Sequence, residues 1–535
     1  MKFLTEKYIP IILFFIFIFF LQGVVNLPVM DRDEARFATA SKTMIETKDF
    51  IDIKMQDEVR YKKPIGIYWL QSVSNYFFGD TPFDKIWVYR IPSILGIIFT
   101  LFLINNYSRK IFGKEISYLS IIFIVTSLLT ISEIHQAKTD GILFLTITLC
   151  NLIILKALNE KSLNFRDKLI YWVTLGLGIL VKGPIIIIFT VLPLTGLCFC
   201  KKKNLFKEIW SPFGFLIFLI ISIPWFIIIT FVSNGLFWHE SVIHDLYYKV
   251  KSGQESHGFP PGYYSLLFLV MFWPGVIFVP SLLKKIYNEW KVTFFNNECL
   301  LFVVLWFLIP FLIYEIIPTK LPHYIFPSYV ALSILISKTI VDNKNFNKLL
   351  GYLPLFFLCL YPISILTAKV FVIYQYSHLD FKIWIIVLTL LILLAMQIVN
   401  FLKKKMVKLL TCVILFQSVV YLSAVYYMVP KLEVLWVSEK INNVINKNIN
   451  QVDKVFHYGF NEPSLIFLTS HKAKRKNINE YKKLNSSEKI LYISTNTQNH
   501  RINENKFSDV KIVDQFEGFN YSQGKKVLVK FFIIQ

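Results

Sequence analysis

Ionisable side chains crowd the first long hydrophilic stretch of the sequence, residues 30–71. They gather at its two ends, with Asp31, Arg32, Asp33, Glu34 and Arg36 at the start and Arg60, Lys62 and Lys63 near the close. Asp33 beside Glu34, with Arg36 a turn further on, fits a general base that a neighbouring cation aims into a cavity. The alternative is that these acids cap a short helix and complement its dipole.

The basic end of this stretch is also rich in aromatic residues. It reads RYKKPIGIYW over residues 60–69, so that Tyr61, Lys62 and Lys63 precede a proline and then Tyr68 and Trp69. This pattern is a second candidate binding group. Its alternative is an interfacial anchor, because basic and aromatic side chains are attracted to anionic lipid headgroups.

Three later turns carry isolated polar groups of the same kinds. Asp140 closes the turn at 133–141, Lys182 precedes Gly183 and Pro184, and the turn at 318–327 holds Lys320 and Tyr324. Asp140 can cap the next helix, Lys182 can extend along a helix end toward water, and Lys320 can anchor at the interface. Each residue is therefore a candidate with a structural alternative.

Histidines and carboxylates gather in the long loop at 233–262. His257, His239 and Glu240 are the metal candidates there, although their spacing matches no tight zinc motif. A solvated loop also collects such residues without a metal. No cofactor is required by the sequence, and a divalent metal stays one of the alternatives.

The composition is that of an integral membrane protein. Of 535 residues, 55% are hydrophobic and 17% aromatic, and the mean hydropathy is +0.53. The formal charge of +22 comes mostly from Lys and Arg in short loops, where they set topology, so no nucleic-acid partner is expected. The six cysteines fall in or beside apolar runs, which argues against a disulfide framework.

Apolar runs and loop charges predict about thirteen transmembrane helices. The runs lie near 8–25, 86–104, 116–132, 141–157, 169–181, 184–200, 210–232, 263–283, 299–317, 325–340, 350–374, 381–402 and 407–428. Basic residues concentrate in alternate loops. This alternation fits thirteen spans only if the N-terminus is cytoplasmic and the C-terminus is extracytoplasmic. The first run lacks a signal-peptidase site and is expected to stay uncleaved. All the candidate groups above then lie on the outer face.

The chain divides into two expected parts. Residues 1–430 form an all-α polytopic membrane domain, whose first outer loop, 26–85, carries amphipathic juxtamembrane helices. Residues 431–535 read as a small extracytoplasmic α/β domain, with alternating strands at 454–458, 489–494, 510–513 and 526–532 and a helix starting near Pro463. Because this domain shows no catalytic motif, its deletion is expected to disturb folding or acceptor choice more than bond-making.

At these residues the sequence resembles the GT-C class of membrane glycosyltransferases. It is most similar to the bacterial branch with the polyprenyl-phosphate aminoarabinose transferases that modify lipid A, and more distantly to the protein O-mannosyltransferases. The resemblance spans roughly 8–430 through five ordered landmarks: Asp33-Glu34-x-Arg36; Tyr61-x-Lys63-Pro64 with Tyr68-Trp69; Lys138-Thr139-Asp140; His257-x-x-Pro260 with Tyr263-Tyr264; and Lys320-Leu321-Pro322-x-Tyr324-x-x-Pro327.

The resemblance implies transfer of a sugar from a polyprenyl-phosphate donor to an envelope acceptor, a lipid A-like glycolipid or a protein, at the outer face of the bacterial inner membrane. It implies that Asp33 is the base and Asp140 its orienter or a second carboxylate. Lys63 would meet the leaving phosphate. The expected substrate-binding residues are Glu34, Arg36, Tyr61, Lys62, Lys182, His257, Lys320 and Tyr324.

Two departures and two rival functions remain. Ile65 stands where relatives often have a second proline, and Lys62 stands where some have an acid that helps to hold a metal. The extra cation would suit an anionic acceptor. A transporter or flippase of lipid-linked sugar would also need many spans, but the ionisable residues cluster at one face and no internal repeat is evident, which favours an enzyme. A catalytically inactive paralogue is the other rival.

Overall fold

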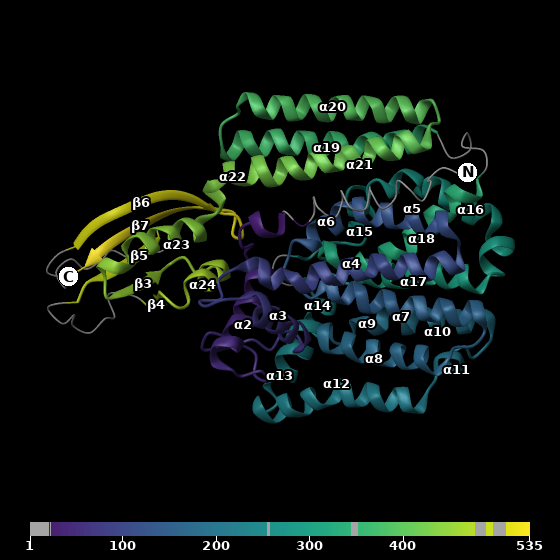
Figure 1. The fold of residues 1–535 in the computed structure, drawn as a ribbon, viewed down its shortest axis with the longest axis horizontal. Helices are drawn as coiled ribbons and strands as arrows, with labels where there is room; N and C mark the ends of the chain where they lie inside the picture. The colour runs from purple at the N-terminus through teal and green to yellow at the C-terminus, as the bar shows by residue number, and fades with distance from the viewer. Residues whose placement is uncertain are drawn as a thin grey trace.

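Long apolar helices run side by side through most of the molecule (Figure 1). The computed structural model describes residues 21, 23–253, 257–343, 351–476, 488–495 and 510–534. Over these ranges, eight helices are long and apolar enough to cross a membrane, or up to ten if each of two bent pairs forms one span. The multi-pass helical fold expected from the sequence is therefore confirmed.

Twelve of the thirteen expected runs coincide with helices. The single helices are α4 (Ile86–Ile111), α7 (Asp140–Glu160), α8 (Phe165–Lys182), α12 (Pro212–Val232), α17 (Glu298–Ile316), α18 (Tyr329–Asp342), α19 (Tyr352–Tyr376), α20 (Phe381–Leu402) and α21 (Met406–Ser423). The others are broken: α5 (Lys114–Thr126) with α6 (Leu128–Ile134), α9 (Ile185–Phe189) with α10 (Val191–Lys201), and α15 (Tyr263–Met271) with η2 (Gly275–Phe278) and α16 (Val279–Glu289). The first expected run, 8–25, lies mostly outside the described residues, and the number thirteen stays a prediction.

Two of the expected runs are bent, the α5–α6 pair by 67° and the α15–α16 pair by 112°. The turn between α8 and α9 has a local cause. Gly183 ends α8 with a φ of 65°, which glycine adopts without steric cost, and Pro184 then leads into α9. Gly178 packs against Ile186 across this turn. The sequence 182–184 is thus a turn between two helices rather than a kink in one.

Short helices and one small hairpin cover the end of the bundle from which the C-terminal part extends (Figure 1). They are α2 (Asp33–Thr47), the small hairpin β1 (Lys54–Met55) and β2 (Glu58–Val59), α3 (Gly66–Phe78), α13 (Leu236–Trp238), the π-helix η1 (His239–Tyr247), α14 (Tyr248–Lys251) and the 3-10 helix η4 (Pro322–Ser328). The sequence predicts an amphipathic juxtamembrane helix here, and the structure adds that every residue of α2 from Glu34 to Met44 except Arg36 is buried within the protein. Both α3 and the C-terminal α24 (Pro463–Thr469) pack against it.

The C-terminal sheet domain extends from this end. Its strands are β3 (Lys454–Tyr458), β4 (Lys474–Arg475), β5 (Ile490–Thr495), β6 (Val510–Asn520) and β7 (Lys525–Ile534), in the order β4-β3-β5-β7-β6. β3 runs parallel to β4 and β5, whereas β7 is antiparallel to β5 and β6. The helices α23 (Val437–Asn448) and α24 complete it, and Val437, Ile441 and Leu465 share its apolar core with the sheet.

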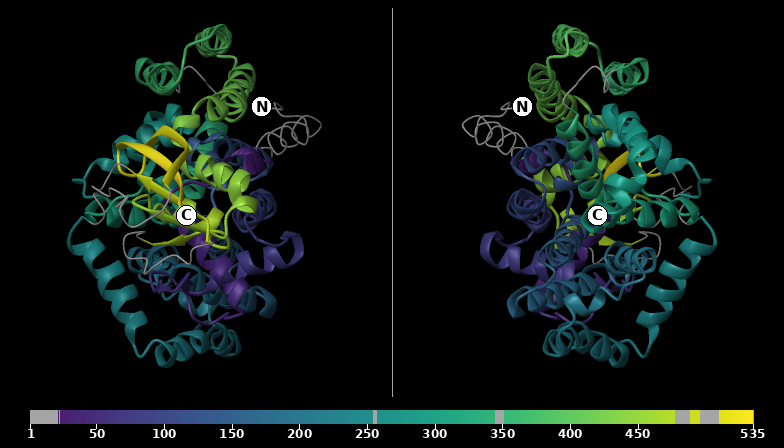
Figure 2. Two further views of the ribbon diagram at one scale, coloured as in Figure 1. Left: turned by 90° about the vertical axis from the view of Figure 1, so that its left-hand side faces the viewer. Right: turned by 90° about the vertical axis from the view of Figure 1, so that its right-hand side faces the viewer.

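The remaining helical segments are short connections. They are α11 (Phe206–Ile209), η3 (Trp290–Phe295), η6 (Ala424–Met428), α22 (Val429–Lys431), η7 (Glu433–Leu435) and η8 (Ile449–Gln451). The end views in Figure 2 show α19, α20 and α21 as a group at one side of the bundle. The main apolar core lies between α4, α5, α7, α17 and α18.

Candidate active site

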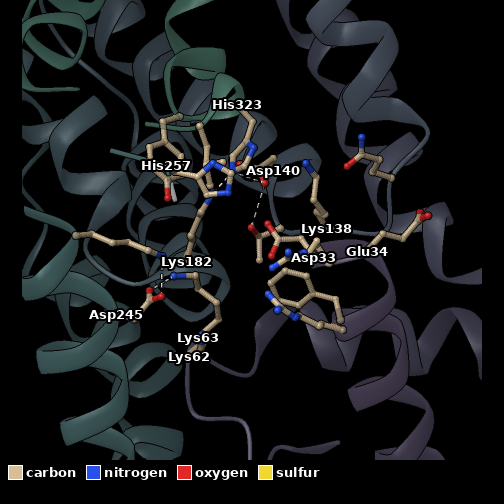
Figure 3. A pocket seen from close by; sticks show the side chains of 18 of the residues that line it. Asp33, Glu34, Lys62, Lys63, Lys138, Asp140, Lys182, Asp245, His257 and His323 are labelled. Atoms are coloured by element: carbon tan, nitrogen blue, oxygen red, sulfur yellow. Dashed lines mark hydrogen bonds and ion pairs between the residues drawn. The ribbon is translucent and has the colours of Figure 1, made fainter. Parts of the chain in front are cut away.

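A cavity of about 310 Å³ opens at the end of the bundle where α2 begins (Figure 3). Its walls come from seven places in the sequence: the start of α2, the segment 60–63, the turn 136–140, the end of α8, the η1–α14 segment, the loop at 257 and the loop at 319–324. Eight lysines and arginines line it against five carboxylates: Arg32, Arg36, Arg60, Lys62, Lys63, Lys138, Lys182 and Lys249 face Asp31, Asp33, Glu34, Asp140 and Asp245. An excess of cations over carboxylates suits an anionic ligand.

Asp33 is the first residue of α2 and faces this cavity (Figure 3). Burial alone would raise its pKa, but the surrounding positive charges, led by Lys138, lower it below the ordinary value. No hydrogen bond joins its carboxylate to another described residue. Asp33 is thus an ionised carboxylate that can accept a proton or a hydrogen bond from a bound group.

Glu34, its neighbour, is occupied in holding the structure. Both of its oxygens accept hydrogen bonds of 2.8 Å from Arg90 of α4, and they also accept the backbone N–H groups of Ala137 and Met30. The Arg90 side chain is fully buried and donates as well to backbone carbonyls before α2. Glu34 lines the cavity but its acceptors are filled, so it positions α2 and the turn at 137.

Lys63 shares a carboxylate with Lys249. Asp245, on η1, accepts hydrogen bonds from Lys63 and, at 2.6 Å, from Lys249. Burial would raise the pKa of Asp245, but these two lysines lower it to about 2. Burial lowers the pKa of Lys63, an effect that Asp245 opposes. Two cations beside one anion leave a net positive charge that can meet a phosphate.

Asp140, which also lines the cavity, is paired with Lys182 and lies close to His323. Its Oδ1 accepts a hydrogen bond of 2.6 Å from Lys182, and its Oδ2 lies 3.9 Å from Nε2 of His323. Asp140 begins α7 and Lys182 ends α8, and these two helices pack together, which brings residues 42 positions apart into contact. The Lys182 ammonium also lies 5.6 Å from the centre of the Tyr324 ring.

Two distant loops meet to carry His257 and Tyr324. The carbonyl of His257 accepts the N–H of Lys320 at 3.0 Å, and Gly258 forms a bridge with Thr319. His257 and Tyr324 therefore line the cavity together with Lys62 and Arg36, as the sequence predicted for this group.

Two of the predicted substrate-binding residues do not line the cavity. Tyr61 is buried and donates a hydrogen bond of 2.6 Å to Asp52. Lys320 is also buried, and its ammonium donates to the carbonyls of Tyr314, Glu315 and Ile317 at the end of α17. Cations at a helix C-terminus complement its unpaired carbonyls, so Lys320 supports the wall of the cavity from behind.

The predicted metal candidates separate into two places. His257 faces the cavity, whereas His239 and Glu240 lie on η1 beside His244, with ligand atoms within 4.8 Å of one another. The exposed cluster has the residue types for a divalent ion. A second set in the described part of the chain, Glu133, Asp140 and His323, is buried, but Lys138 and Lys182 already bind its carboxylates.

Sequence reasoning missed the partners that arrange these residues. Arg90 lies inside an apolar run, and a lone arginine there is a signal that it pairs with a buried acid. Asp245 lies in the long loop at 233–262, and nothing in the sequence indicates its contact with Lys63, 182 residues away. Asp31 and Arg60, which belong to the charged stretch 30–71, also line the cavity.

A bundle of membrane helices with a cationic, carboxylate-bearing cavity at one end and a small sheet domain beside it is the arrangement that the resemblance to the GT-C class of membrane glycosyltransferases implies. Comparisons with known proteins are consistent with this resemblance. A family model described as dolichyl-phosphate-mannose-protein mannosyltransferase matches residues 62–228. This range includes Lys62, Lys63, Asp140 and Lys182 of the cavity wall.

The chain is also similar to curated aminoarabinose transferases. The undecaprenyl phosphate-alpha-4-amino-4-deoxy-L-arabinose arabinosyl transferase 2 of Proteus mirabilis is 25% identical over 334 residues, which cover 61% of this chain and 58% of the relative. The corresponding transferase of Wigglesworthia glossinidia brevipalpis is 27% identical over 64% of this chain and 61% of the relative. The chain thus spans about three fifths of the length of the curated relatives that it matches.

The fold agrees over nearly the whole length with a solved structure. The crystal structure of ArnT from Cupriavidus metallidurans bound to undecaprenyl phosphate covers 98% of this chain and 98% of its own, with a TM-score of 0.75 and 14% identity. The same protein in the apo state gives a TM-score of 0.74.

Proposed function

We propose that this protein transfers a sugar from a polyprenyl-phosphate donor to an acceptor at the outer face of the bacterial inner membrane. The observation that carries the proposal is the cavity itself, in which the ionised Asp33 stands opposite a cluster of cations. The names of the curated relatives, which act with undecaprenyl-phosphate aminoarabinose, support a donor of this chemical class.

In this reaction Asp33 is the base. The acceptor hydroxyl oxygen attacks the anomeric carbon of the donor sugar and its proton passes to the Asp33 carboxylate. If the acceptor is a phosphate, it is already ionised near neutral pH, and Asp33 positions it instead. The lowered pKa of Asp33 keeps the carboxylate ionised before each turnover.

The cations meet the leaving group. The bond between the anomeric carbon and the phosphate oxygen breaks, and the polyprenyl phosphate departs with the electron pair and gains negative charge. Lys63 and Lys249 hold one net positive charge beside Asp245, and Arg60 and Lys62 line the same wall. Removing one preorganised donor of this kind typically lowers the rate by about 10²–10³.

The acceptor that we favour is a lipid A-like glycolipid. The excess of lysines and arginines over carboxylates suits an acceptor that itself carries phosphate. Lys62, which stands where some relatives have an acid, adds to this excess, and Lys62→Glu is expected to weaken activity or change acceptor choice. A protein acceptor is the second candidate, because the matching family model is described as a protein mannosyltransferase.

The topology belongs to the same proposal. The loop charges favour an N-terminus in the cytoplasm and a C-terminal domain outside, and in this orientation the cavity opens toward the extracytoplasmic side of the membrane. A cysteine introduced at exposed Lys474, in β4, should react with a membrane-impermeant thiol reagent in intact spheroplasts. A cysteine at exposed Lys403, in the α20–α21 loop, should react only after lysis.

The test of the function is mass spectrometry of lipid A and other envelope glycolipids. Cells without the protein are compared with cells carrying the wild type, Asp33→Asn, Lys63→Ala, or the control Asp57→Asn, whose carboxylate lies in the same outer loop away from the cavity. A sugar-sized mass should be lost in the null strain and restored by the wild type and Asp57→Asn only. Restoration by all variants would point to transport, and an unchanged glycolipid profile with altered glycoproteins would point to a protein acceptor.

A further inference from the structure

The backbone immediately before Asp33 adopts an unusual conformation. Arg32, at the N-cap of α2, has φ 72° and ψ −118°. These angles are those of the first central residue of a type II′ turn, where glycine normally stands because a Cβ atom is strained there. Arg32 can keep this conformation only if its surroundings hold it.

The C-terminal domain supplies the contacts that hold it. The hydroxyl of Tyr521, in the turn between β6 and β7, accepts the N–H of Asp31 at 2.7 Å. The carbonyl of Ser522 accepts a hydrogen bond of 2.6 Å from the Arg32 guanidinium. From α24, the N–H of Ser464 donates to the Asp31 carboxylate at 3.3 Å. Both residues before Asp33 are therefore bound by chain more than 430 positions away.

The turn that makes these contacts is itself braced. The Asn520 side-chain oxygen accepts hydrogen bonds from the backbone and hydroxyl of Ser522 and from the backbone of Gln523. The side-chain amides of Asn520 and Gln523 donate to Glu462, at 2.8 and 2.9 Å. Glu462 is buried and directly precedes α24, so the turn and α24 form one rigid support.

A second attachment joins α24 to the middle of α2. The buried Lys42 donates a hydrogen bond of 2.9 Å to the carbonyl of Phe467. The Phe467 ring packs edge-on against Tyr89 at 5.2 Å and shares an apolar cluster with Ala35 and Ala38 of α2. The helix that carries Asp33 is thus fixed by the C-terminal domain along its side as well as at its start.

We propose that the C-terminal domain positions the catalytic carboxylate, with the β6–β7 turn holding Asp31 and Arg32 in the strained conformation that directs Asp33 into the cavity. Tyr521 is then a positioning residue for the reaction, although it belongs to a domain that carries no catalytic motif. The role of Asp33 as a base rests on the proposed function. The contacts that fix residues 31 and 32 do not depend on it. Deletion of 431–535 would then impair bond-making itself, contrary to the expectation from the sequence.

The first test is hydrogen exchange of the full-length protein in detergent, followed by mass spectrometry of peptides. Tyr521→Phe removes the acceptor of the Asp31 N–H while keeping the ring. Loss of one hydrogen bond should speed exchange of residues 31–36 by about fivefold, with unchanged exchange in β3 and β5. The control is Tyr287→Phe, because Tyr287 is 88% exposed on α16. Unchanged exchange at 31–36 in Tyr521→Phe would overturn the proposal.

The second test uses glycine to relieve the strain. Arg32→Gly and Arg32→Ala both remove the guanidinium, but only glycine adopts φ 72° without a steric cost. In the Tyr521→Phe background, Arg32→Gly should therefore show slower exchange at 31–36 and a higher kcat than Arg32→Ala. Equal behaviour of glycine and alanine would contradict a strained conformation held by the domain.

Turnover separates positioning from a purely structural contact. With a synthetic polyprenyl-phosphate aminosugar donor and lipid A as acceptor, Tyr521→Phe should lower kcat about tenfold and leave the donor KM within about twofold and the Tm within about 2 °C, because a misdirected base costs rate more than binding. If Tyr521→Phe instead lowers the Tm and the yield of folded protein in proportion to its loss of kcat, Tyr521 has only a structural role and the proposal is overturned. If the wild type transfers no sugar, the proposed function fails, and the exchange experiments still decide whether the domain holds residues 31 and 32.

Discussion

The Lys182 ammonium donates a 2.6 Å hydrogen bond to Oδ1 of Asp140, and both side chains are more than nine-tenths buried. The pair joins the start of α7 to the end of α8 at the wall of the cavity. In the sequence, each residue also has a purely structural interpretation. Asp140 can cap a helix, and Lys182 can extend along a helix end toward water. The structure gives them a common role instead, because each neutralises the other at the wall of the cavity.

This pair should behave as a unit in stability measurements. Asp140→Asn leaves the Lys182 charge buried without its partner, and Lys182→Met does the same to Asp140, so each should lower the free energy of unfolding by about 3–5 kcal/mol. The double variant should be less destabilised than the sum of the two. Denaturant melts of the purified protein in detergent measure the three values, and strict additivity would show that the pair contributes no coupling.

Asp245 should give the protein a stability that depends on pH. Its pKa in the folded state is about 2, below its ordinary value of 3.8. A lowered pKa means that the unfolded state binds the proton first, so the contribution of Asp245 is present above about pH 4 and is lost as the pH falls toward 2. The difference corresponds to about 2 kcal/mol. Melts between pH 6 and 3 should show a steeper loss for the wild type than for Asp245→Asn, and parallel curves would contradict the assignment.

The same substitution should strengthen binding of the lipid phosphate that the proposed reaction would release. Asp245→Asn removes the shared anion of Lys63 and Lys249 and leaves both cations in place. Undecaprenyl phosphate should then bind about tenfold more tightly. The Asp245 carboxylate has the same negative charge as the phosphate, and this repulsion over a few ångströms costs about 1–2 kcal/mol at an intermediate dielectric. Native mass spectrometry with the lipid phosphate measures the affinity, and Asp57→Asn is the control for loss of a carboxylate elsewhere. Weaker binding would mean that Asp245 orients Lys63 more than it neutralises it.

The sequence predicted the parts of this molecule that depend on local pattern. Hydropathy placed twelve helical runs, alternation placed the strands β3, β5 and β7, and Pro463 marked the start of α24. Local pattern could not show the enclosure of α2, because the helix that covers it, α24, follows more than 400 residues later. The strained Arg32 was equally hidden, since arginine is an unusual residue for that conformation.

For the site, the sequence predicted several of the residues that line the cavity but not how they pair with one another. Asp33, Lys63, Asp140, Lys182, His257 and Tyr324 line the cavity as expected. The pairings did not follow from the sequence, because charge attraction acts across space and Asp245 or Arg90 could have faced any of several partners. Glu34 and Lys320 were assigned to substrate for the same reason, as their types fit a binding role and only the contacts reveal that their acceptors and donors are already filled.

Glu34 and Arg90 allow a sharp test of this distinction. If Glu34 holds α2 in place, Glu34→Gln should lower the Tm and the yield of folded protein, because it leaves the fully buried Arg90 without its bidentate partner. Arg90→Lys should do the same, because lysine cannot make two parallel bonds to one carboxylate. The loss expected for either variant is about 3 kcal/mol or more in the free energy of unfolding. A substrate contact would instead raise KM in a protein of normal stability. Thermal melts and donor KM, measured on the same preparations, decide between the two roles, and a stable Glu34→Gln protein with a raised KM would return this residue to the substrate.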